Sequence, residues 1–89
     1  MHTNLENQIL EFCEQKWKEK TLEKLANKLS EECGEICGAV VKIPEMRATS
    51  EDLKNELGDL LIVVAQFAAK LDTTIDELVV ERFKQIKLR

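Results

Sequence analysis

The sequence predicts an all-α fold, a four-helix bundle. The 89 residues include only three glycines and one proline, so few residues interrupt a helix. Hydrophobic residues make up 44% of the chain and charged residues 34%, which is typical of a compact folded protein. Apolar residues recur every three to four positions in four segments with short connections, as in a bundle. We therefore predict one helical domain over residues 1–89.

Helical spacing and an N-cap define the first two helices. The first is predicted over about Asn4–Lys18. Thr21 is the expected N-cap of the second helix, which reaches about Ile43 because Pro44 cannot continue it. The apolar stripe of this second helix comprises Leu22, Leu25, Leu29, Cys33, Ile36 and Val40.

The third predicted helix is apolar on every side over part of its length. Thr49 together with Asp52, or Ser50 alone, provides its N-cap, and the helix reaches about Leu71. From Leu60 to Ala69 every residue except one is apolar, so no polar face is left for solvent. Four short helices cannot surround such a segment. We therefore predict that a second copy of the chain completes the bundle as a homo-oligomer.

The fourth predicted helix begins at a capping box. Thr74 is followed three residues later by Glu77, the spacing at which side chain and backbone satisfy each other at a helix start. The apolar residues that follow at helical spacing are Ile75, Leu78, Val79, Phe83 and Ile86.

Charge and hydropathy exclude two kinds of partner. The net charge of −4 argues against a nucleic acid polymer, whose phosphates need a surplus of Lys and Arg. No apolar run approaches the roughly 18 residues that span a bilayer, which argues against a membrane. The first ten residues also lack the features of a signal peptide, so a cytoplasmic location is expected.

The three cysteines are expected to be buried, reduced thiols. Cys13, Cys33 and Cys37 are odd in number, and the last two are four apart in a helical pattern, which suits packing better than a disulfide. Zinc is not expected, because His2 is the only histidine available to accompany them.

Two pairs of acidic residues flank the apolar stripes of the second and third helices. Glu32 and Glu35 are three apart, as are Glu56 and Asp59, so the members of each pair are neighbours on a helix surface. Glu32 lies about 60° from the centre of its stripe, at the predicted edge of the core. If the two helices pack antiparallel, the four carboxylates converge. Oxygen ligands without His or Cys favour Mg²⁺, with Mn²⁺ as a substitute.

Acids at this spacing are also common on solvated helix faces, so either pair alone would be read as structural. The combination on consecutive helices favours a site. Each pair also encloses a glycine, Gly34 or Gly58, which costs about 1 kcal/mol in a helix interior and indicates close approach of backbone or ligand. Gly38 could instead allow tight helix crossing.

The segments KLSEECGEICGAV and ELGDLLIVVAQFA resemble the MazG-like, all-α nucleoside triphosphate pyrophosphohydrolases, whose signature is E-x-x-E, a spacer and E-x-x-D. The likeness covers about residues 17–89. It implies Mg²⁺-dependent hydrolysis of a nucleoside triphosphate between the α and β phosphates, within a homodimer or homotetramer. By matching positions, the metal ligands would be Glu32, Glu35, Glu56 and Asp59. Glu31, or a ligand carboxylate itself, would orient the attacking water.

Positive and aromatic side chains are expected to contact the substrate. Lys28 is the best candidate from geometry, being one turn before Glu32, although it could equally serve as a solvated partner of that residue. Arg82 and Lys87 resemble basic positions of the family's last helix, but Arg82 stands where Lys is usual. Trp17 would either stack on a nucleobase or anchor the core or an interface.

Two other functions compete with nucleotide hydrolysis. The chain could be a non-catalytic helical oligomer that serves as an interaction module, in which case Mg²⁺ would not stabilise it. A related pyrophosphohydrolase activity on polyphosphate or phosphoribosyl-ATP would keep the metal site and change the substrate. A di-iron carboxylate bundle is excluded, since it needs E-x-x-H on two helices.

Overall fold

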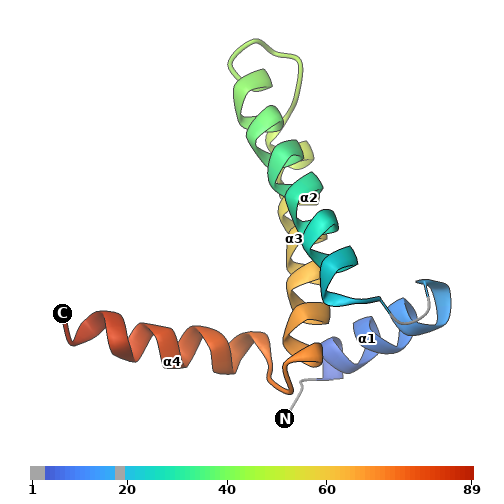
Figure 1. The fold of residues 1–89 in the computed structure, drawn as a ribbon. Coiled ribbons are helices and arrows are strands. Elements are labelled where there is room, and N and C mark those ends of the chain that lie inside the picture. Colours follow the sequence, from blue (N-terminus) through green and yellow to red (C-terminus); the bar gives the residue numbers. More distant parts are fainter. Residues whose placement is uncertain (1–3, 18–19) are drawn as a thin grey trace. The chain divides into compact units, whose positions relative to one another are not determined.

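The computed structural model describes residues 4–17 and 20–89, and these residues form four α-helices and no strand (Figure 1). The helices are α1 (Asn4–Trp17), α2 (Leu22–Lys42), α3 (Ser50–Lys70) and α4 (Ile75–Lys87). The predicted all-α class is confirmed. The predicted end of the first helix at Lys18 lies outside the described residues.

Threonine side chains begin three of the helices, as the sequence predicts. The hydroxyls of Thr21, Thr49 and Thr74 each accept a hydrogen bond from the backbone N–H three residues later, at 3.2, 3.1 and 3.1 Å. The Asp52 carboxylate accepts a hydrogen bond from the N–H of Thr49 at 2.8 Å, so a reciprocal capping box starts α3. These bonds satisfy N–H groups that a helix start leaves without a partner.

The chain divides into two compact units. One is Lys20–Val63, which holds α2, the following loop and the first part of α3. The other consists of the described part of Met1–Glu19 together with Val64–Arg89. Within the first unit, α2 and the first part of α3 run side by side in opposite directions as a helical hairpin (Figure 1).

The hairpin packs along a seam with alternating spacing of four and three residues. On α2 and its C-cap residue the buried or half-buried residues at this spacing are Leu25, Leu29, Glu32, Ile36, Ala39 and Ile43. On α3 the corresponding residues are Leu53, Glu56, Leu60 and Val63. This is the spacing of knobs-into-holes packing, and it is apolar except at the two glutamates. The carboxylates therefore occupy positions that normally hold leucine or isoleucine.

The apolar residues of α2 form two rows rather than the single predicted stripe. Leu22, Cys33 and Val40 are exposed and lie about 70° around the helix from the seam. The prediction of buried thiols is therefore wrong for Cys33 and Cys37, which lie on this outer side, and right for Cys13. None of the three cysteines forms a disulfide, as expected.

The turns that end α2 and α3 have the same construction. Met46 and Asp72 have positive φ angles, 61° and 56°. The N–H after each of them reaches back five residues, from Arg47 to Lys42 O at 3.0 Å and from Thr73 to Ala68 O at 2.9 Å. This is the Schellman arrangement, in which glycine is the usual left-handed residue. Here it ends α2 beside Pro44 and fixes the position of Arg47.

None of the residues of α4 is buried within the chain. Its exposed apolar side chains are Leu78, Val79, Val80, Phe83 and Ile86. None of the helices in the described ranges has both the length and the hydropathy needed to cross a bilayer.

Candidate metal centre

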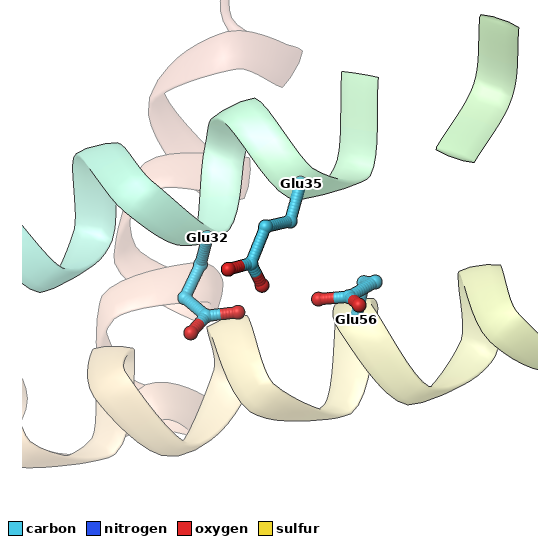
Figure 2. Close-up of side chains that lie close together, drawn as sticks. All are labelled: Glu32, Glu35 and Glu56. Carbon is cyan, nitrogen blue, oxygen red and sulfur yellow. The ribbon is translucent and has the colours of Figure 1, made fainter. Parts of the chain in front are cut away.

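Three carboxylates converge between the two helices of the hairpin, one of them buried, one half-buried and one, that of Glu35, exposed. Glu32 and Glu35 extend from α2 and Glu56 from α3, and the three side chains point toward one another (Figure 2). One carboxylate oxygen from each lies within 4.8 Å of the other two. Oxygen ligands of a magnesium ion are about 3–4 Å apart when each is about 2.1 Å from the metal. A small rotation of the side chains would bring these oxygens to that spacing.

The seam places two of these carboxylates in the interior. Glu32 has only 3% of its surface exposed, and Glu56 is half-buried. Glu32 is therefore deeper than the predicted edge of the core. The predicted apolar stripe combines the two rows of α2, so its centre lies between them. The row that packs against α3 is only one of the two, and it includes Glu32.

Lys28 neutralises part of the negative charge of the glutamates on α2. Its Nζ lies 3.2 Å from Oε1 of Glu32 and 3.6 Å from Oε2 of Glu31. The hydrogen bond to Glu32 is the main reason that the pKa of Lys28 is raised, and the nearby charges of Glu32 and Glu31 add to it. This contact favours the expected role of Lys28 as a partner of Glu32 over a role as a free cation for the substrate.

The remaining oxygens of the interior carboxylates have no such partner. Oε2 of Glu32 and Oε2 of Glu56 are both buried and receive no hydrogen bond. A buried polar atom that lacks a partner costs about 1–3 kcal/mol, and more when it is charged. Buried oxygens of this kind that face a third carboxylate are a donor set for a hard divalent cation.

Glu35 responds to the same crowding. Its pKa is raised, first because it shares a hydrogen bond with Glu56, which requires a proton on one of the two carboxylates, and then because of the charge of Glu56. A hydrogen bond with Glu32 and the charge of Lys28 act in the opposite direction. A cation among these oxygens would replace the shared proton, so the residues fit the divalent ion that the sequence predicts.

The other two predicted acids lie at the rim. Asp59 is exposed and is not among the described carboxylates that converge, so its role as a fourth ligand stays a prediction. Glu31 is exposed and lines an open pocket of about 610 Å³ next to the carboxylates. It is therefore accessible to a water molecule near the site.

The remaining predicted substrate contacts lie in the other compact unit. Arg82 donates a hydrogen bond to Gln85 Oε1 at 2.6 Å, and Lys87 Nζ lies 5.4 Å from the centre of the Phe83 ring. Trp17 is about half-exposed and meets the Phe12 ring edge-on at 5.9 Å. Their participation in a site stays a prediction.

Two cations near the site were not predicted. Lys42 and Arg47 line the same pocket as Glu35 and Glu56. Lys42 looked like an ordinary basic residue in the last turn of a helix. The position of Arg47 depends on a turn in which Met46 has a positive φ angle. Glycine is the usual residue in such a turn, and the sequence has none there from which the turn could be predicted.

The glycines beside the acids do not serve helix crossing within the chain. A Cβ atom added at Gly34, Gly38 or Gly58 would have no described neighbouring atom within 4 Å. Gly34 and Gly38 instead line the pocket. Their open surroundings agree with the expectation of ligand approach at Gly34 and do not support tight crossing at Gly38.

Comparison with known proteins gives one finding. The family model described as "MazG nucleotide pyrophosphohydrolase domain" matches residues 20–89. No curated protein and no solved structure matches the chain. The matched range contains the whole helical hairpin, with its three converging carboxylates, and α4.

Proposed function

The chain belongs to the MazG nucleotide pyrophosphohydrolase family, and from this premise we propose that it hydrolyses nucleoside triphosphates in a Mg²⁺-dependent reaction. Ribonucleotides and deoxynucleotides are both candidate substrates, and Mn²⁺ is the expected substitute ion. The observation that carries the proposal is the convergence of Glu32, Glu35 and Glu56, with two buried oxygens that receive no hydrogen bond.

The proposed reaction breaks the bond between the α-phosphorus and the oxygen that bridges it to the β-phosphorus. A water oxygen attacks the α-phosphorus, and the electron pair of the breaking bond leaves with pyrophosphate. The products are a nucleoside monophosphate and pyrophosphate. Bound Mg²⁺ supplies charge neutralisation on the phosphoryl oxygens and lowers the pKa of coordinated water.

The acidic residues are assigned either to metal binding or to accepting the proton of the attacking water. Glu32 is the most buried of the three acids and is paired with Lys28, and we assign it to metal binding together with Glu35 and Glu56. Asp59, one turn after Glu56, is assigned as the fourth ligand through a change of side-chain rotamer. Glu31 and Glu35 line the pocket and are the candidates to accept the proton of the attacking water.

We also propose that the active form is a homodimer or homotetramer. A 13-residue helix such as α4 is marginal in water without packing, and α4 buries nothing within its own chain. The outer side of the hairpin is apolar as well, with Leu22, Val40 and Leu61 exposed. A second copy would cover surfaces of this kind. A cytoplasmic location stays a prediction.

Pyrophosphate release tests the proposed activity. Purified protein is assayed with a panel of ribo- and deoxynucleoside triphosphates, with and without Mg²⁺. We expect release only with Mg²⁺, and we expect Glu32→Gln and Asp59→Asn to lower kcat by at least about a hundredfold, the scale of a lost transition-state electrostatic contact.

Glu11→Gln, an exposed acid on α1, is the matched control and should keep wild-type turnover. Undiminished turnover in both site variants would refute the site. Absence of turnover on every nucleotide would refute the activity and favour a non-catalytic interaction module.

A further inference from the structure

The pocket beside the carboxylates extends toward the loop that joins α2 and α3. Glu35 and Glu56 line the part nearest the metal centre, and Lys42 and Arg47 line the part nearest the loop. Lys42 follows Glu35 by two helical turns, which is about 10 Å along α2. The pocket therefore has an acidic part that suits a cation and a basic part at a fixed distance from it.

The two cations are available to an external anion. None of the ion pairs in the described part of the chain includes Lys42. Arg47 is paired only with Glu45, two residues away, and both side chains are more than half exposed, so this contact is weak and exchangeable. Asp52, the acid that also lines this part, accepts the N–H of Thr49 and is held in the cap of α3.

The wall of the pocket has no place for a nucleobase. Its uncharged lining residues are Gly34, Gly38, Ala39 and Ala48, and no aromatic side chain lines it. A base needs an aromatic or broad apolar surface on which to stack. Lys and Arg beside small residues instead suit phosphate oxygens, which approach the backbone closely. The start of α3 at Ser50 adds the partial positive charge of a helix N-terminus.

We propose that Lys42 and Arg47 bind the terminal phosphates of the substrate, the part that leaves as pyrophosphate. The inference rests on the proposed function and adds a direction to it: the triphosphate points toward the α2–α3 loop, and the nucleoside lies on the other side of the metal centre. The same contacts make the pocket selective for triphosphates, since a monophosphate does not reach the two cations.

Calorimetric titration tests the proposal without turnover. Inorganic pyrophosphate, a deoxynucleoside monophosphate and a non-hydrolysable triphosphate analogue are titrated with Mg²⁺ into the wild type, Lys42→Gln and Arg47→Gln. Each substitution removes a charged hydrogen bond and should weaken pyrophosphate and triphosphate binding by about tenfold or more. Monophosphate affinity should not change. Lys54→Gln, at an exposed lysine outside the pocket, is the matched control.

Thermal stabilisation by Mg²⁺ alone, equal in all variants, verifies that fold and metal centre are intact. Loss of pyrophosphate and triphosphate affinity with unchanged monophosphate affinity supports the proposal, even if no nucleotide is hydrolysed. Unchanged pyrophosphate affinity in both variants, an equal loss for monophosphate, or no pyrophosphate binding by the wild type would overturn it. Failure of the proposed function would instead appear as absent pyrophosphate release while these affinities persist.

Discussion

Helices α2 and α4 depart in opposite ways from the usual distribution of polarity. On α2 a glutamate with 3% exposure occupies the packing seam, whereas on α4 a phenylalanine is 58% exposed and no residue is buried. Both arrangements are unfavourable in an isolated chain. Under the proposed function, each arrangement suits a different partner: a cation would complete the hairpin, and another polypeptide would complete α4.

The largest effect is expected from a charged substitution on the exposed apolar surface of α4. Phe83→Asp should dissociate the proposed oligomer and reduce the helicity of α4. Burial of each Phe contributes about 1.5–3 kcal/mol. Removing both from a symmetric dimer should therefore weaken association by about 10²- to 10⁴-fold. Sedimentation equilibrium and far-UV circular dichroism measure the two results.

Lys84→Asp introduces the same charge at the neighbouring, polar position of α4 and should keep the wild-type mass. A wild-type protein that is monomeric at high concentration would contradict the proposal that a second copy of the chain covers α4.

A smaller effect is expected on the polar side. In metal-free protein at alkaline pH, Glu56→Gln should slightly raise the unfolding temperature, because it removes the charge that crowds Glu35. The folded-state pKa of Glu35 is raised, so protonation stabilises the folded wild type as pH falls through that pKa toward the ordinary value of 4.5. The advantage of the variant should therefore shrink with falling pH.

Magnesium should reverse the order of stability at alkaline pH. At a hundred times its dissociation constant, an ion stabilises the folded state by about 2.7 kcal/mol. The wild type should gain this stability and Glu56→Gln should not. Thermal unfolding followed by circular dichroism, with and without Mg²⁺ and with Glu11→Gln as control, measures these stability changes. If Glu56→Gln is less stable than the wild type without metal, repulsion between Glu35 and Glu56 does not destabilise the wild type, and the prediction is contradicted.

The smallest effect concerns the two turns that end α2 and α3. Met46 has φ 61° and is 93% exposed, so Met46→Gly loses no packing and relieves a left-handed residue. The expected gain is about 0.5–1 kcal/mol, since the flexibility of glycine in the unfolded chain offsets part of the relief. Asp72→Gly should gain less, because Asp tolerates this conformation better. Urea unfolding of both variants measures the difference, and equal gains would contradict it.

Sequence reasoning predicts the helices well because their signals are local. Thr21, Thr49 and Thr74 act over three residues, and each begins the helix that the spacing predicts. The depth of Glu32 was missed because two neighbouring apolar rows give one averaged stripe, and only the packing of α3 distinguishes them. The exposure of Cys33 was missed for the same reason.

The candidate site was predictable in part. The acid pairs identify Glu32, Glu35 and Glu56, whose convergence depends only on an antiparallel hairpin. Arg47 could not be identified in this way, because its position depends on the dihedral angle of a non-glycine residue. Glu35 and Asp59 each follow a seam glutamate by three residues and are both exposed, yet only Glu35 is among the described carboxylates that converge, so spacing alone does not determine which acids meet.

If the proposed metal binding holds, glutamates in a helix seam would make the lifetime of the polypeptide depend on its ionic environment. Under the proposed metal binding, a cation among Glu32, Glu35 and Glu56 would hold the hairpin closed by electrostatic attraction. Without the cation, repulsion between the carboxylates would favour transient opening. A protease that samples open chains would therefore degrade magnesium-depleted protein faster than loaded protein. The degradation rate of the chain would then report whether the ion is bound.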